Sequence, residues 1–297
     1  AGGLYFKGNL TTLKAGKRLI DLIVAHNITL DQLTYSDSEE VIILKREKDG
    51  PRDRGQWLEY DDTSLIKKYR SDLQEINQWL RQAEIIGDMD ADDNNRRLKR
   101  VFNNGLFTEG GRLFGGFWQP MGGEERRQYI EINGEAVVEL DYGQINVRLL
   151  YSMIGAIPPD GDLYAIPKLS RIKDSRDGIK KVLSSAIYSS EKLNRMPKGA
   201  RQYFPKRISY SDAMKAIKSH HPDIANMFFK GLGMKLMFKE SEIMVSLLLE
   251  LKKKGVVALQ VHDGVLVAKG TCQLATNTMK KVIKNMAGLD VPVSIKA

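Results

Sequence analysis

Two short apolar segments, each followed by an aspartate, constrain the fold of this chain more than any other sequence feature. The segment from Ala136 to Leu140 is rich in β-branched residues and predicts a buried strand that ends at Asp141. The segment from Val256 to Val261 predicts a second strand, and Asp263 follows it. If the strands are neighbours, facing residues lie roughly 4.5–5.5 Å apart at Cα, which suits carboxylates that bridge two metal ions roughly 3.5–4 Å apart. The alternative is that Asp141 merely ends a strand and Asp263 merely makes a turn.

The second aspartate is followed by a strong hairpin signal. An Asp-Gly pair between apolar residues is typical of a two-residue hairpin turn, because both positions of that turn need a left-handed backbone. Asp263-Gly264 is followed by Val265-Leu266-Val267. The sequence therefore predicts a hairpin whose turn contains Asp263 and Gly264.

Charge and cysteine content limit the function classes. The 297 residues can bury a large core in one or two domains, and a net charge of +9 with a pI near 9.4 favours an anionic partner. Nucleic acid, an anionic membrane face and a phosphorylated substrate all fit that charge. The single Cys272 excludes an intramolecular disulfide, and the four histidines lack the spacing of a zinc site. Without an apolar run of about 18 residues or a signal segment, we expect a soluble cytoplasmic protein with no membrane partner.

Periodicity and turn residues divide the rest of the chain into elements. Helices are predicted over 13–25, 62–86, 145–153, from Ser175 to about 188, from Ser211 to Pro222, over 223–254 with an interruption at 231–233, and over 274–286. Strands are predicted over 40–45 and 291–295, a linker over 88–95, a solvated basic helix face over 96–100, and a glycine-rich loop over 110–120.

A polar ribbon runs along the helix that begins at Ser175. Arg176, Lys180, Ser184 and Tyr188 recur every fourth residue, so they drift about 40° per step along one face. A solvated face explains the arginine and the lysine, but it explains the tyrosine less well. The cations could instead clamp a polyphosphate.

The segment 198–210 interleaves cations with aromatic residues. Single-stranded nucleic acid is bound by this combination, because cations attract the backbone and aromatic rings stack on bases. Arg201, Lys206 and Arg207 would supply the charge. The alternative is an ordinary loop.

Taken together, these stretches resemble the family A nucleic-acid polymerases, which include bacterial DNA polymerase I and, more distantly, the single-subunit phage-type RNA polymerases. The resemblance covers about 110–297. The first palm motif of the family, Asp-Tyr-Ser-Gln-Ile-Glu-Leu-Arg, is matched at Asp141, Tyr142, Gln144, Ile145 and Arg148. The Arg, Lys and Tyr of the family's fingers helix are matched at Arg176, Lys180 and Tyr188. The last motif, Gln-Val-His-Asp-Glu, is matched at Gln260-Val261-His262-Asp263, and Gly111-Arg112-Leu113 with Gln119 resembles the segment that meets the primer–template minor groove.

The resemblance implies an α+β fold with right-hand polymerase architecture. An antiparallel palm sheet would carry helical fingers and a reduced N-terminal thumb-like region. Residues 1–105 would form an accessory or thumb-like region, and 106–297 would form the palm, with fingers inserted at about 152–235. Under 300 residues leave no room for a proofreading exonuclease.

The resemblance also implies a role for individual residues. Asp141 and Asp263 would hold two Mg²⁺ ions, for which Mn²⁺ could substitute, with the Tyr142 carbonyl as a further ligand. Lys180 would act in catalysis and, with Arg176, would bind the incoming triphosphate. The remaining nucleotide-binding positions are Tyr188 against the nascent base pair, Ser184, Asn146 and Gln144. The nucleic-acid-binding positions are Arg112, Gln119, His262, Gln260, Arg201, Lys206 and Arg207.

Three positions depart from the family pattern. Gly264 replaces the glutamate that ends the last motif, which supports the site in the family but is not its essential ligand. Asn146 stands where the DNA polymerases have the glutamate that excludes a ribose 2′-hydroxyl, and Ser184 stands where they have an aromatic residue. The choice between deoxyribose and ribose is therefore open.

The sequence favours a minimal template-directed DNA polymerase that binds primer–template nucleic acid and nucleoside triphosphates. We expect a monomer of bacterial, phage or mobile-element origin, with accessory replication proteins as further partners. A primase or small RNA polymerase is the first alternative, and an inactive polymerase relative that only binds nucleic acid is the second. A two-metal nuclease is disfavoured because no third acid is evident near the two strands.

Overall fold

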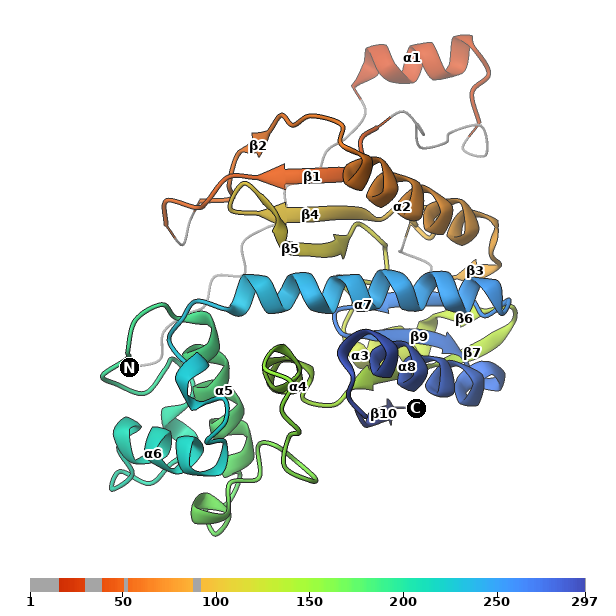
Figure 1. Ribbon diagram of the computed structural model, residues 1–297. Coiled ribbons are helices and arrows are strands. Elements are labelled where there is room, and N and C mark those ends of the chain that lie inside the picture. The colour runs from red at the N-terminus through yellow and green to blue at the C-terminus, as the bar shows by residue number, and fades with distance from the viewer. Residues whose placement is uncertain (1–15, 30–38, 51–52, 88–91, 297) are drawn as a thin grey trace, which may run out of the picture. The chain divides into compact units, whose positions relative to one another are not determined.

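The computed structural model describes residues 16–29, 39–50, 53–87 and 92–296 (Figure 1). The chain divides into two units, Ala1–Glu39 and Glu40–Ala297. In the first unit the described helix is α1 (Lys17–Ala25), none of whose residues is buried. The helix predicted over 13–25 is thus confirmed from Lys17 onward, and 13–15 lie outside the described residues.

The second unit has a mixed α+β fold, as predicted, and its described strands form two sheets. The four-stranded sheet has the order β2-β1-β4-β5, in which β1 and β4 are parallel and the other pairs are antiparallel. Its strands are β1 (Ile42–Lys45), β2 (Trp57–Leu58), β4 (Lys99–Asn103) and β5 (Leu106–Phe114). The domain boundary predicted at about residue 105 falls between β4 and β5 and stays a prediction.

The six-stranded sheet is antiparallel throughout and has the order β3-β6-β7-β9-β8, with β10 paired to β7. Its strands are β3 (Ile85–Ile86), β6 (Glu131–Ile132), β7 (Glu135–Tyr142), β8 (Ala258–Val261), β9 (Gly264–Ala268) and β10 (Val293–Lys296). Strand β9 is buried along its whole length, and β8 is too. Strands buried on both faces lose the alternation of a half-exposed strand, which explains the continuous apolar runs of β8 and β9.

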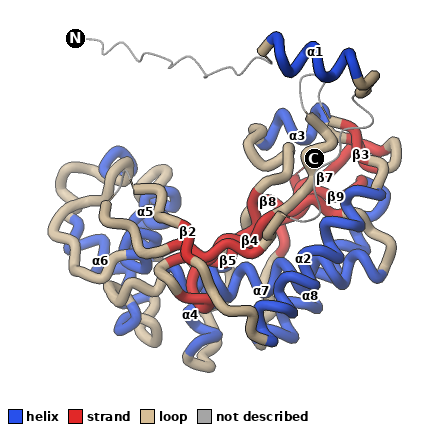
Figure 2. The backbone as a smooth tube through the Cα atoms, turned by 90° about the horizontal axis from the view of Figure 1, so that it is seen from above, coloured by secondary structure: helices blue, strands red, loops and turns tan. Residues whose placement is uncertain are grey.

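In addition to these sheets, the described part of the second unit contains seven α-helices: α2 (Ser64–Gln82), α3 (Gly123–Tyr129), α4 (Ile145–Met153), α5 (Ser175–Tyr188), α6 (Tyr210–His220), α7 (Gly233–Lys253) and α8 (Cys272–Ala287). Helix α7 packs against β5, α8 and α2. Figures 1 and 2 both show α5 and α6 together, away from the six-stranded sheet.

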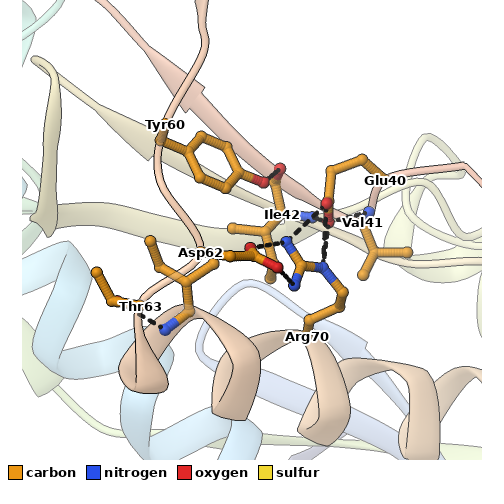
Figure 3. A network of polar contacts seen from close by, with 8 residues as sticks. Glu40, Val41, Ile42, Tyr60, Asp62, Thr63 and Arg70 are labelled. Carbon is orange, nitrogen blue, oxygen red and sulfur yellow. Dashed lines mark hydrogen bonds and ion pairs between the residues drawn. The ribbon is translucent and has the colours of Figure 1, made fainter.

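An ion-pair network fastens α2 to the start of the four-stranded sheet (Figure 3). The Arg70 guanidinium donates to both oxygens of Asp62, at 2.6 and 2.9 Å, and to both oxygens of Glu40. The Glu40 carboxylate also accepts the backbone N–H groups of Val41 and Ile42. Thr63 caps the helix through its hydroxyl, so the predicted helix start is confirmed.

The basic cluster 96–100 is not a solvated helix face. It leads into β4, where Arg100 is buried and its guanidinium pairs with Glu242 of α7. Arg96 donates to the carbonyls of Ala83 and Ile85 at 2.6 and 2.7 Å. These cations neutralise or cap groups inside the protein, which a count of charges along the sequence cannot reveal.

Other boundaries also differ from the prediction. Much of the predicted glycine-rich loop belongs to β5, where Gly110 and Gly111 have φ values of +78° and +75° beside a register shift. Helix α6 is capped by Ser209 rather than Ser211, because Ser209 and Asp212 form a reciprocal capping box. The linker predicted over 88–95 lies in part outside the described residues.

Candidate active site

Asp141 lies at the end of β7, opposite Gly264 in the ladder between β7 and β9. The two strands that precede the aspartates, β7 and β8, are therefore not adjacent, because β9 runs between them. A Cβ atom at Gly264 would lie 2.2 Å from Asp141 Oδ1 and 2.4 Å from the Leu140 carbonyl oxygen. The glycine leaves the space that the Asp141 carboxylate fills, so this position cannot hold the glutamate of the family pattern without moving that carboxylate.

The second aspartate lies in the turn of the β8–β9 hairpin. Val261 pairs with Gly264, so His262 and Asp263 form the turn, and His262 has a φ of +52°. The predicted turn at Asp263-Gly264 is thus wrong by one residue, because Gly264 pairs within β9. The Tyr142 N–H donates to the Asp263 carbonyl at 3.2 Å, which ties this turn to the end of β7.

The two aspartates influence each other electrostatically. Burial is the main cause that raises the pKa of the Asp263 carboxyl, and the negative charge of Asp141 raises it further. Arg112 and His262 oppose the shift. A buried carboxyl whose ionisation is disfavoured by a second negative charge lies where a cation would be stabilised.

The side chain of Lys296 places a positive charge beside Asp141. Its ammonium group contacts the Asp141 carboxylate and lies 3.4 Å from Glu139 Oε1. Strand β10 carries it there, because β10 pairs with β7 and Lys296 lies opposite Glu139. The hydrogen bond to Asp141 is the main cause that raises the pKa of Lys296. Sequence reasoning predicted the strand but not its pairing, so it missed this lysine.

A buried carboxylate enters the site from α7. Glu240 is 1% exposed and makes a bidentate pair with Arg112, with Nε to Oε1 at 2.8 Å and Nη2 to Oε2 at 3.0 Å. Burial raises the pKa of Glu240 to about 7, Arg112 opposes this shift, and Asp263 adds to it. Sequence reasoning found no third acid. The available signal was spacing, since Glu240 lies four residues after Leu236 and three before Ile243, on the buried stripe of the helix.

Tyr188 connects the end of α5 to the group formed by Arg112, Glu240 and Asp263. A Cβ atom at Gly233 would lie 2.1 Å from Tyr188 Cδ1, so the ring lies directly against the first residue of α7. Burial raises the pKa of Tyr188, with smaller effects from Arg112, Glu240 and Asp263. Tyr188, Arg112 and Asp263 thus lie near enough to affect one another electrostatically, and their roles in a site stay a prediction.

The polar ribbon on α5 is exposed along its length, and Tyr188 itself is 38% exposed. Arg176 Nε donates to Asp162 Oδ2 at 2.5 Å, and its guanidinium carbon lies 5.4 Å from the centre of the Tyr164 ring. Lys180 and Ser184 are exposed, and Lys180 has no ion pair within the described part of the chain. Lys180 is thus free to meet an anionic ligand.

Helix α4 begins with the remaining residues of the first palm motif. The buried Arg148 donates to the Gly143 carbonyl, to Gln144 Oε1 and to the Gly161 carbonyl, each at 3.1 Å. Gln144 is thus held by Arg148 and has a φ of +54°. Asn146 Oδ1 is buried and has no hydrogen-bond partner among the described residues. A buried acceptor without a partner is costly, so Asn146 can gain from a ligand donor.

Gln119 and Gln260 bond to each other rather than to open surface. Gln119 Nε2 lies 3.0 Å from Gln260 Oε1, and Gln260 Nε2 donates to the His262 carbonyl at 2.5 Å. Trp118 Nε1 donates to the Gln260 carbonyl at 2.8 Å. This network positions the turn that carries Asp263. The exposed His262 side chain remains available for a ligand.

The segment 198–210 uses its aromatic residues for packing. Phe204 and Tyr210 are buried, and Phe204 lies against Gly178 of α5. Arg201 donates to the carbonyls of Phe204 and Ile208 at 2.9 and 3.0 Å. Stacking of bases on Phe204 is thus excluded in this arrangement. Lys206 and Arg207 are exposed, and their predicted contact with nucleic acid stays a prediction.

The oxygen atoms at the strand ends are of the chemical type that binds a hard divalent cation. Carboxylate and carbonyl oxygens are the ligands that Mg²⁺ prefers, and Asp141 and Asp263 with the Tyr142 carbonyl supply such oxygens. The described residues contain no group of three or more His, Cys, Asp or Glu side chains that could hold a metal ion. The site therefore offers fewer protein ligands than a closed metal cage.

Within the described residues, no helix has the length and apolar character needed to cross a membrane. No protein-family model and no curated protein match the chain. The chain is similar to a solved structure described as the POL domain of Pol1 from M. smegmatis in complex with DNA primer-template and dNTP. The match has a TM-score of 0.43 and 15% sequence identity, and it covers 84% of this chain and 57% of that one. The chain thus spans a little over half the length of that structure.

Proposed function

We propose that this protein is a template-directed nucleotidyltransferase that extends a primer 3′ end, with DNA as the favoured product. One observation carries the proposal: Asp141, Asp263, Arg112 and Tyr188, which are far apart in the sequence, converge on one place with the buried Glu240. Each of the first four was singled out in the sequence for this chemistry.

The proposed chemistry needs charge control more than covalent catalysis. Bound divalent ions would activate the attacking 3′-hydroxyl and neutralise the triphosphate, and Asp141 and Asp263 are the side chains that would hold them, with the Tyr142 carbonyl. A metal ion at Asp141 would take the place of the Lys296 ammonium group. Arg176 and Lys180 would orient the triphosphate from the exposed face of α5, where both side chains reach solvent.

The Arg112–Glu240 pair has a positioning role in this proposal. Arg112 is half-buried, and the bidentate geometry fixes its guanidinium beside Asp263 and Tyr188. A primer phosphate would meet a cation whose orientation is already determined. Pre-organisation of this kind lowers the free energy needed to order the site during binding.

The proposal is tested by extension of a labelled primer on DNA and on RNA templates, with deoxynucleotides and ribonucleotides supplied separately. Asp141→Asn and Asp263→Asn should abolish Mg²⁺-dependent incorporation while primer–template affinity, measured by fluorescence anisotropy, changes little. Asp290→Asn is the matched control, because Asp290 is exposed and pairs only with Lys284 in the described structure. Mg²⁺-dependent synthesis retained in either site variant would refute the assignment.

A second candidate function is nucleic-acid binding without catalysis. The contact between Lys296 and Asp141 favours it, because an ammonium group already neutralises the carboxylate that a metal ion would need. The two candidates differ in metal binding. Paramagnetic Mn²⁺ binding to the unmodified protein that is lost in Asp141→Asn supports the enzyme, and its absence in the unmodified protein supports the binding module. A primase or RNA polymerase would extend chains with ribonucleotides in the same extension assay.

A further inference from the structure

A pocket of about 600 Å³ lies outside the candidate active site. One wall is the face of α6 that carries Tyr210, Met214 and Lys218, which are spaced four residues apart. The other walls are 192–194, which follow α5, and Phe229, which precedes α7. None of the residues assigned to the active site lines this pocket.

The charge of the pocket is of one sign. Lys192, Lys215 and Lys218 line it, and no Asp or Glu does. Within the described residues none of these lysines has an ion pair. The nearest acid on α6, Asp212, accepts hydrogen bonds from Ser209 N and Oγ at 2.9 and 2.6 Å. A cluster of unpaired cations around a cavity stabilises an anionic ligand.

Tyr210, one of the residues that line the pocket, has a hydroxyl group without a partner. Tyr210 is only 8% exposed, and its hydroxyl oxygen is buried without a hydrogen bond among the described residues. Burial raises the pKa of Tyr210 to about 12, so the hydroxyl keeps its proton at neutral pH. Buried hydroxyl groups in native proteins almost always have a partner. This hydroxyl is itself buried and does not open into the pocket, so the lysines and Phe229 carry the case for a ligand.

The remaining residues of the pocket wall are of two kinds: Asn194, Ser211 and Ser219 are polar, and Leu193, Met214 and Phe229 are apolar or aromatic. Phe229 is half-buried and has a φ of +64°, held by its N–H group, which donates to the Ala186 carbonyl at 2.7 Å. Lys218 Nζ lies 5.8 Å from the centre of the Phe229 ring. Leu193 and Met214 extend the apolar part. A strained backbone that presents an aromatic ring beside cations is a combination that binds the base and phosphate of a nucleotide.

We propose that this pocket binds a nucleotide unit, with the lysines around its phosphate groups and Phe229 beside its base. The volume is within the range of about 300–1,000 Å³ for small-molecule sites, which exceeds the need of an isolated phosphate ion. The unit is either a free nucleoside triphosphate or one residue of a single strand, since both present the same chemistry. This site does not depend on the proposed function, because binding can be measured without catalysis.

The test measures ATP binding by calorimetry and binding of a labelled 12-nucleotide single-stranded DNA by anisotropy, both in EDTA so that metal-dependent binding at the active site is excluded. The double variant Lys215→Ala/Lys218→Ala should weaken binding of one or both probes by at least about tenfold. The control Lys280→Ala/Lys281→Ala loses the same charge from exposed positions on α8 and should change affinity less than about twofold.

Each outcome decides the proposal. Loss of ATP binding alone identifies a free nucleotide as the ligand, and loss of DNA binding alone identifies a strand. No loss in the pocket variant, or equal loss in the control, overturns the site. If inorganic tripolyphosphate binds as tightly as ATP and is weakened equally, the assignment of a nucleotide is overturned. Failure here leaves primer extension unaffected, so it is distinct from failure of the proposed function.

Discussion

Glu240→Gln is the substitution that most directly tests how the candidate site is held together. Glutamine keeps the shape of the side chain and one acceptor for Arg112, but it removes the ionisable carboxyl. Burial raises the pKa of Glu240 from 4.5 to about 7 in spite of the bidentate contact with Arg112. The folded state therefore holds this proton more tightly than the unfolded state does.

The sign and size of the effect follow from linkage. A group whose pKa is raised on folding stabilises the fold fully below its unfolded pKa, and the contribution is lost as the pH rises through its folded pKa. For a shift from 4.5 to about 7, at about 1.4 kcal/mol per pKa unit, the free energy of unfolding should fall by roughly 2–3 kcal/mol between pH 5 and pH 8. Titrating groups that do not interact with Glu240 cancel when the two pH dependences are subtracted, whereas Asp263, which interacts with it, contributes to the difference.

The assay is urea unfolding of the unmodified protein and Glu240→Gln at pH 5, 6, 7 and 8. Relative to the variant, the unmodified protein should lose roughly 2–3 kcal/mol of unfolding free energy over this range. The same pH dependence in both proteins would refute the raised pKa. A difference of opposite sign would mean that the ion pair with Arg112 outweighs the cost of burial, and that the Glu240 carboxylate is charged at neutral pH.

Three further predictions concern the site. Gly264→Ala should reduce primer extension by more than about tenfold and lower the urea midpoint, because its Cβ atom would meet Asp141 and Leu140, whereas Gly50→Ala, with no atom within 4 Å, should change neither. Lys180→Ala should raise the nucleotide KM or lower kcat by an amount on the order of 2–3 kcal/mol without loss of template affinity, and the control Lys181→Ala should have a smaller effect. If Lys180→Ala weakens template affinity as much as it weakens nucleotide use, α5 binds the nucleic-acid backbone instead. The unmodified protein should incorporate ribonucleotides measurably, and Asn146→Glu should shift the kcat/KM ratio toward deoxynucleotides; rejection of ribonucleotides beyond roughly 10²-fold by the unmodified protein would show that Asn146 is not the gate.

Local signals predicted most of the elements around the site. The apolar repeat of α2 and its Thr63 cap were sufficient to predict that helix, and α4, α5 and α8 were predicted by the same kind of spacing. The two aspartates were recognised because each follows a short apolar strand. Such signals depend on neighbours within a few residues, and they are present in the sequence whatever the tertiary fold.

The contacts that complete the site depend on pairing between distant segments. Lys296 reaches Asp141 only because β10 pairs with β7, and Glu240 reaches Arg112 only because α7 packs beside β5. Arg100 appeared to belong to a solvated basic cluster, yet it is buried and paired. The sequence alone does not show whether a charged side chain is solvated or pairs with a distant residue, as Arg100 does with Glu242, 142 positions away. These roles could therefore be recognised only in the folded structure.

The turn that carries Asp263 tolerates changes of side chain better than changes of length. Val261 and Gly264 close a turn of two residues, and β9 is paired on both sides. One residue added to or removed from β8 would exchange the two faces of that strand, because side chains alternate with a period of two. Descendants of this protein can therefore replace many apolar residues of the hairpin with others of similar size, but an insertion or deletion between Ala258 and Ala268 would carry the Asp263 carboxylate away from Asp141. Comparison of related chains should find this interval constant in length even where its residues differ.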